Sequence, residues 1–76
     1  MGMMVTGRKA SETADLVRYE FGLDRQFDRV LTIDKSTWQV DAEDGRFDSA
    51  AGAVVSKIKQ AWQEQGEFPS GVVFAS

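Results

Sequence analysis

Apolar and small residues recur every three or four positions between residues 48 and 65, which is the period of a helix with one buried face. Asp48 or Ser49 is the expected N-cap, and Gly66 is the residue at which the helix should end. We expect Phe47 to pack against the start of this helix. The predicted buried positions are Ala51, Val54, Val55, Ile58, Ala61 and Trp62.

A second helical spacing lies near the N-terminus and predicts a helix over residues 12–21. Ser11 is its expected N-cap, and Gly22 is expected to adopt the left-handed conformation that ends many helices. The spacing is carried by Ala10, Ala14, Val17 and Phe21, with Leu16 beside them.

Three further segments have the composition of β-strands. Residues 29–34 contain a run of β-branched residues and leucine, and residues 37–42 alternate polar and apolar side chains. The short polar connection between these two segments predicts an antiparallel hairpin. After the helix-breaking residues Pro69 and Gly71, Val72–Ala75 is the third expected strand.

These elements predict an α+β fold, a two-layer sandwich in the order α-β-β-α-β, with a three-stranded sheet and both helices on one face. The helix between the second and third strands makes a crossover, so we expect the third strand to lie parallel to one strand of the hairpin. Residues 1–9 show no periodicity and are expected to form a flexible N-terminal arm. Residues 10–76 are expected to form a single small α+β domain.

The composition narrows the possible chemistry, because the 76 residues include no histidine and no cysteine. An imidazole base, a thiolate nucleophile, disulfides and the usual zinc ligands are therefore absent. Carboxylates such as Asp34 and Asp41 remain, but acid–base catalysis would require burial to raise their pKa. So small a domain offers little room for such a site, and we expect no enzymatic activity, no catalytic residue, no metal and no cofactor.

The net charge of −3 arises within residues 34–48, which hold five acids and two bases. Nucleic-acid-binding surfaces are usually basic, so this distribution disfavours nucleic acid as a partner. An alternative hypothesis remains, in which Arg8, Lys9 and Arg18 contact phosphates as part of a nucleic-acid-associated module. No segment approaches the roughly 20 apolar residues of a membrane-spanning helix, and we expect a cytoplasmic protein that does not act at a membrane.

The densest polar segment is DAEDGRFD, residues 41–48. Its carboxylates could hold calcium or magnesium, or could form an acidic surface that inhibits a basic partner. The spacing does not fit an EF-hand loop, because Val40 and Ala42 fall on ligand positions when Gly45 takes the glycine position. A turn that leads into a helix cap is the structural alternative.

The remaining candidate is a protein-interaction surface on the side of the sheet that the helices leave open. Period-two alternation sends both apolar and polar side chains to that side. The strand Val72–Ala75 also leaves an edge that can pair with another β-strand. We therefore expect a small accessory or regulatory module that binds another protein, or itself as a homodimer. The candidate partner-binding residues are Val30, Thr32, Gln39, Asp41 and Val73, with Asp44 at the acidic end.

Overall fold

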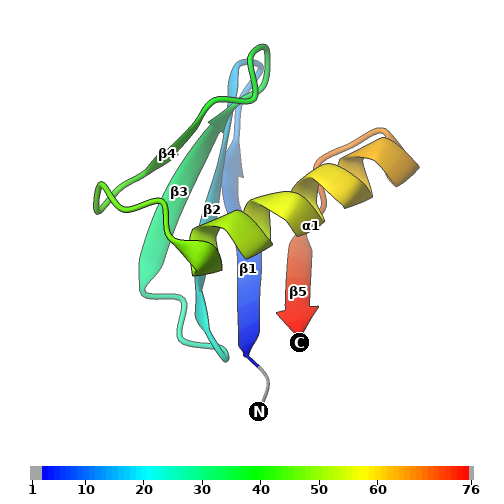
Figure 1. Cartoon of the computed structure of the whole chain (residues 1–76). Coiled ribbons are helices and arrows are strands. Elements are labelled where there is room, and N and C mark those ends of the chain that lie inside the picture. Colours follow the sequence, from blue (N-terminus) through cyan, green and yellow to red (C-terminus); the bar gives the residue numbers. More distant parts are fainter. Residues whose placement is uncertain (1–2, 76) are drawn as a thin grey trace.

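The computed structural model describes residues 3–75, which form a five-stranded sheet with one helix across one face (Figure 1). The strands are β1 (Met4–Glu12), β2 (Leu16–Leu23), β3 (Arg29–Asp34), β4 (Val40–Ala42) and β5 (Gly71–Ala75), and the helix is α1 (Ser49–Gln65). The order across the sheet is β4-β3-β2-β1-β5, and every neighbouring pair is antiparallel. The predicted three-stranded sheet with two helices in the order α-β-β-α-β is therefore wrong.

Strands β1 and β2 occupy the part of the chain where we expected a helix over residues 12–21. Val17, Tyr19 and Phe21 are fully buried and recur at every second residue, as they do on one face of a strand. Val17 and Phe21 are also four positions apart, so this pair fits the period of a helix as well. Tyr19 distinguishes the two patterns, because a helix would turn it away from that face. Aromatic and β-branched side chains favour strands, and the buried tyrosine completes the pattern of β2.

The residues that we expected at the ends of this helix lie within strands. Ser11 is in β1, opposite Arg18 of β2, and is not an N-cap. Gly22 is in β2, where a side chain would collide with the carbonyl oxygen of Gln26 in the following loop. Its glycine is therefore required by the close approach of that loop rather than by a helix end.

The expected flexible arm also needs revision. Residues 1 and 2 lie outside the described part of the chain, whereas residues 4–9 belong to β1, between β2 and β5. The strand pattern was hidden because Gly7 and Lys9 occupy positions that face α1. A side chain at Gly7 would place its Cβ 3.1 Å from Val54 Cγ1 of α1, so glycine lets the helix lie close to the sheet.

The last strand, β5, is antiparallel to β1 and not parallel to a strand of the β3–β4 hairpin as predicted. The register places Phe74 opposite Val5 and Val72 opposite Gly7. Because β1 was not among the expected elements, the crossover through α1 was assigned to the wrong neighbour. In the observed sheet, α1 carries the chain to the free side of β1, where β5 completes the sheet (Figure 1).

The limits of the C-terminal helix agree with its sequence pattern. β3 and β4 form the predicted antiparallel hairpin, but β4 covers only residues 40–42 of the expected 37–42, and Trp38 lies in the connection with a φ of 62°. The Asp48 carboxylate accepts a hydrogen bond from the N–H of Ala51 at 3.1 Å, and Gly66 ends α1 with a φ of 76°. Of the six positions predicted to be buried, Ala51, Val54 and Ile58 are fully buried, whereas Val55 and Ala61 are partly buried and Trp62 is 38% exposed. Phe47 was expected to pack at the helix start, but it is 59% exposed. Within residues 3–75, no helix has both the length and the apolar character needed to cross a membrane.

Candidate interaction surface

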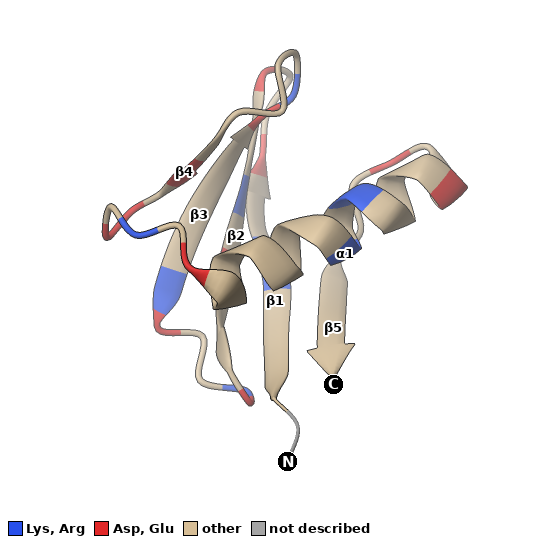
Figure 2. Ribbon diagram, in the orientation of Figure 1, with Lys and Arg blue, Asp and Glu red and all other residues tan. Residues whose placement is uncertain are grey.

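The sheet has two outer strands, β4 and β5, whose free edges differ in composition. β5 has five residues, none charged and none proline, and Figure 2 shows it without acidic or basic positions. β4 has three residues, with exposed Asp41 at its centre and Glu43 and Asp44 directly after it. Short length and charged side chains commonly keep strand edges from pairing with other chains. The β5 edge has no charge and no proline to prevent such pairing.

The backbone of β5 presents a regular set of hydrogen-bonding groups at its free edge. The N–H of Lys9 donates to the carbonyl oxygen of Ser70 at 2.8 Å, and the same register continues with Gly7 opposite Val72. In an antiparallel ladder, every second residue pair shares such hydrogen bonds. Val72 and Phe74 therefore direct their backbone groups toward β1. The residues that direct their N–H and C=O groups toward the free edge are Gly71, Val73 and Ala75.

A groove with a volume of about 270 Å³ runs between this edge and α1. Lys57 and Glu64 give its helical wall a positive and a negative end, separated by two turns or roughly 10 Å. Gln60 and Ala61 lie between them and carry no charge. A strand added at this edge would lie close to these side chains. The groove is lined by Lys57, Gln60, Ala61, Glu64, Val72 and Val73.

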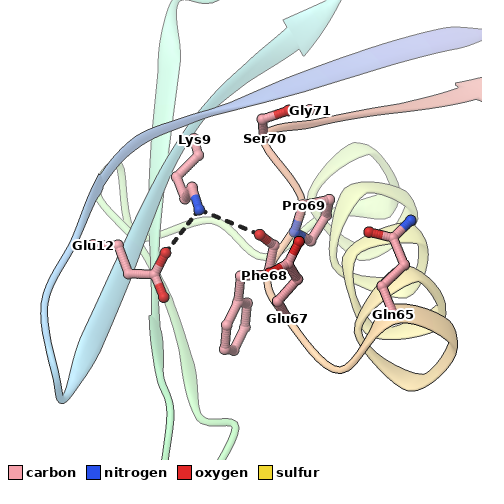
Figure 3. Close-up of a pocket in the computed structure, with 8 residues that line it drawn as sticks. All are labelled: Lys9, Glu12, Gln65, Glu67, Phe68, Pro69, Ser70 and Gly71. Carbon is pink, nitrogen blue, oxygen red and sulfur yellow. Dashed lines mark hydrogen bonds and ion pairs between the residues drawn. The ribbon is translucent and has the colours of Figure 1, made fainter.

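The segment between α1 and β5 determines where the edge strand begins, and Figure 3 shows how it is held. Lys9 Nζ donates to the carbonyl oxygen of Phe68 at 3.2 Å and lies 2.7 Å from a carboxylate oxygen of Glu12. The hydroxyl of Tyr19 donates to the carbonyl oxygen of Pro69 at 2.5 Å. The hollow in Figure 3 has a volume of about 410 Å³, and Lys9 and Glu12 in its wall are paired with each other. We interpret these contacts as an anchor for β5.

Two ionisable groups at this anchor, Glu12 and Tyr19, have shifted pKa values. Hydrogen bonds from Lys35, at 2.6 Å, and from Lys9 hold the pKa of Glu12 below its ordinary value. Burial raises the pKa of Tyr19 far above its ordinary value, and the negative charge of Glu12 adds to this effect. Tyr19 therefore remains a hydrogen-bond donor, and both shifts move these groups away from the range useful for acid–base catalysis.

Four of the six residues that we proposed as partner-binding lie on the sheet face opposite α1. Val30 and Thr32 alternate with the buried residues Leu31 and Ile33 of β3, and Asp41 lies opposite Thr32. Val73, the fourth, is 56% exposed on the same face. Of the other two, Gln39 is exposed just before β4 and Asp44 lies in the turn after it.

Other side chains make this face largely polar. The ion pair of Arg8 with Glu20 spans 2.8 Å, and that of Arg18 with Glu43 spans 3.2 Å. The loop after β2 also crosses the face, and its Phe27 ring lies 4.1 Å from the Arg8 guanidinium. The exposed apolar side chain nearest the β5 edge is therefore Val73, on β5 itself.

The alternative basic surface of Arg8, Lys9 and Arg18 is not assembled as one patch. Arg8 and Arg18 project from the face away from α1, where each is paired with a glutamate. Lys9 projects toward the other face and pairs with Glu12. The three side chains do not converge on a common surface.

The acidic segment of residues 41–48 is organised around Arg29. Its guanidinium lies 2.8 Å from Asp44 and 3.0 Å from Asp48, and these hydrogen bonds lower the pKa of both carboxyl groups. Asp41 is separate, since it lies in β4 opposite Thr32. Among residues 3–75, no three acidic side chains are grouped so that they could hold a metal ion. The segment forms a turn that ends in the Asp48 cap of α1.

Sequence reasoning did not identify Lys57, Gln60 and Glu64 as neighbours of the β5 edge. Their distance from β5 depends on the tertiary arrangement, which no local pattern in the sequence indicates. The uncharged composition of β5 was the available signal, and it pointed to the strand but not to the groove beside it.

Comparison of the chain with protein-family models, curated proteins and solved structures finds no match. The functional inferences therefore depend on the geometry of this chain alone.

Proposed function

We propose that this chain is a small, non-enzymatic cytoplasmic module that binds a protein partner by β-strand addition at the free edge of β5. The observation that carries this proposal is the composition of that edge: five uncharged residues without proline, beside the groove of α1. In β-strand addition, backbone hydrogen bonds supply affinity and the flanking groove selects side chains. An accessory or regulatory role follows from such binding.

The other surfaces support a partner less well. The face opposite α1 carries ion pairs and a loop that crosses it. The carboxylates of Asp44 and Asp48 are already hydrogen-bonded to Arg29. By contrast, the backbone groups of Gly71, Val73 and Ala75 point away from β1. We therefore assign the proposed function to the β5 edge, with Val73 as its central residue.

The substitution Val73→Pro tests this edge while leaving the ladder to β1 in place. Proline removes the N–H of Val73, which points to the free edge, and proline is tolerated at such positions of edge strands. The probe is a fluorescein-labelled peptide of about ten residues, selected on the parent chain from a phage-displayed random library. We expect Val73→Pro to weaken peptide binding at least about tenfold in fluorescence anisotropy.

Ala42→Pro is the matched control on the other edge. Asp34 N–H donates to Gln39 and Glu43 N–H donates to Val30, so the N–H of Ala42 also points away from its neighbour β3. This variant should bind the peptide within about twofold of the parent. Failure to select any peptide, or equal affinity of the parent and Val73→Pro, would contradict the proposed function.

A further inference from the structure

We propose that the partner segment at β5 is an extended peptide with one basic and one large apolar side chain, two positions apart and both directed toward α1. This inference rests on the proposed function, because it states the chemistry of the partner at the same edge. It is supported by three features: the part of α1 that extends past β5, the small residue at that place, and the charges near the end of the helix.

The C-terminal part of α1 extends past the outer strand of the sheet. α1 crosses the strands obliquely, and its C-terminal end lies beyond β5 (Figure 1). Burial along the helix agrees, because Ile58 is its last fully buried residue. Gln65 lies close to two turns later, on the same side of the helix as Ile58, yet it is exposed. The side of α1 that packs on the sheet therefore continues past β5, and we call residues 59–65 the overhang.

A strand added to β5 would meet the overhang at one end only. β5 begins at Gly71, near the part of the sheet where α1 leaves it, and runs away from the helix toward Ala75 (Figure 1). Near this beginning, the side chain of Val72 points toward α1 and lines the groove of about 270 Å³ together with Ala61. The residue of the partner that lies beside Val72 on the same face would therefore enter the groove.

Ala61 leaves room in this groove for a large apolar side chain. It follows Ile58 by about one turn, so it faces the same side of the helix, but it is only partly buried. Val72 and Val73 supply apolar walls on the strand side. A leucine, isoleucine or phenylalanine of the partner would bury apolar surface against these three residues, which stabilises the added strand.

The end of the overhang is negative and has no basic residue to balance it. From residue 60 to residue 76 the chain contains two acids, Glu64 and Glu67, and no base. The last turn of α1 holds no basic side chain, although the free carbonyl groups of a helix C-terminus favour one. Among residues 3–75, neither carboxylate lies in an ion pair, and Figure 2 shows the acidic positions at this end. A basic residue of the partner would supply the missing positive charge.

Lys57 restricts this preference to one position of the partner. It lines the same groove roughly 10 Å before Glu64. Because α1 leaves the sheet toward its C-terminus, Glu64 lies farther along the overhang than Lys57. A strand with several basic residues would also meet Lys57, which disfavours it. Side chains two positions apart lie on one face of a strand at about 6.5 Å, so the basic residue lies two positions from the apolar one, toward the overhang.

Charge reversal at Glu64 tests this pairing with the fluorescein-labelled peptide that is selected on the parent chain. We expect that peptide to contain a lysine or arginine two positions from a large apolar residue. Its affinity should fall about tenfold for Glu64→Lys in fluorescence anisotropy at about 50 mM salt, because attraction is replaced by repulsion. A peptide with glutamate in place of that basic residue should bind Glu64→Lys about fivefold more tightly than it binds the parent.

Asp15→Lys is the matched control, because it changes the net charge equally at an exposed side chain between β1 and β2. This variant should bind the selected peptide within about twofold of the parent. Ala61→Gln tests the apolar position, since the longer side chain fills the groove, and it should weaken binding at least about fivefold. Circular dichroism on each variant verifies that the fold is retained.

Two results would overturn this partner chemistry. One is a selected peptide that has no basic residue but still loses affinity for Val73→Pro, an outcome that leaves the proposed function in place. The other is a basic peptide whose affinity Glu64→Lys leaves unchanged. Failure to select any peptide, or a peptide that binds Val73→Pro as tightly as the parent, would instead contradict the proposed function itself.

Discussion

The two edges of this sheet occupy equivalent positions in the fold but differ in what they present to another chain. β4 is short, has Asp41 at its centre and is followed by acids that Arg29 holds in place. β5 is longer and uncharged, and Lys9 and Tyr19 hold the segment before it through hydrogen bonds to backbone carbonyl groups. Short length and a charged residue disfavour pairing at the β4 edge, whereas β5 is longer and has no charged residue.

The difference also shows where the charged residues of the chain are used. On the β4 side, Asp44 and Asp48 lie close to the edge, and both form ion pairs with the guanidinium of Arg29. On the β5 side, Glu12 forms ion pairs with Lys9 and Lys35 beside the segment that precedes β5. The strand β5 itself has no charged side chain. Breaking each set of contacts should therefore have different consequences for stability and for association.

Arg29→Ala should have the largest effect on stability, through the β4 side. The Arg29 side chain is only 15% exposed, bonds to Asp44 and Asp48, and lies over the Phe21 ring at 4.6 Å. Losing these contacts should lower the free energy of unfolding by about 2 kcal/mol, as measured by urea denaturation. Arg46→Ala, at a side chain 69% exposed and 3.8 Å from Asp44, should cost less than about 0.5 kcal/mol. Equal losses would contradict the central role of Arg29.

Gly7→Ala acts on the β5 side. The added Cβ would lie 3.1 Å from Val54 Cγ1 and 3.3 Å from Val72 Cγ2. Valine side chains have few alternative rotamers that would relieve these contacts. We therefore expect the free energy of unfolding to fall by about 1 kcal/mol and β5 to pair less tightly with β1. Gly52→Ala is the control, since its Cβ would meet only the Phe47 ring at 3.8 Å. It should stabilise the helix by up to about 1 kcal/mol in the same denaturation experiment. A stabilised Gly7→Ala variant would show that α1 and β5 can move apart.

Glu12→Gln should have the smallest effect, and the effect should depend on pH. The pKa of Glu12 is lowered in the folded state, so its contribution to stability is present above its unfolded value near 4.5 and is lost as the pH falls through the folded value. At about pH 6 the variant should be less stable than the parent by under about 1 kcal/mol, because the ion pairs are partly exposed. As the pH falls below about 4.5, the two stabilities should approach each other in urea titrations. A difference independent of pH would mean that Glu12 acts through packing rather than charge.

The elements that sequence patterns predicted correctly are those whose determinants are local. α1 has its cap at Asp48, its stop at Gly66 and a buried stripe between them. The hairpin of β3 and β4 has a short connection that leaves no choice but antiparallel pairing. In each case, residues within a few positions of one another supply the hydrogen bonds and the hydrophobic period.

The N-terminal hairpin could not be predicted in the same way. The pair Val17 and Phe21 fits two periods, and the core-facing positions of β1 include Gly7 and Lys9 rather than large apolar residues. Their presence in a central strand is explained by tertiary contacts: α1 packs closely over Gly7, and the segment before β5 accepts a hydrogen bond from Lys9. These contacts join Gly7 and Lys9 to residues tens of positions away in the chain, so no local sequence pattern predicts these contacts. Lys57 and Glu64 are also separated from β5 in the chain, and for the same reason they were not predicted to lie beside it.

The sequence by itself determined the limits of α1, the β3–β4 hairpin and the uncharged character of β5, because side-chain period, capping and charge act over a few residues. Only the tertiary structure decided that β5 runs antiparallel to β1, that β1 exists as a central strand, and that the α1 groove lies beside the free edge. Strand pairing joins residues distant in the chain, and its outcome depends on which edges the rest of the sheet leaves available.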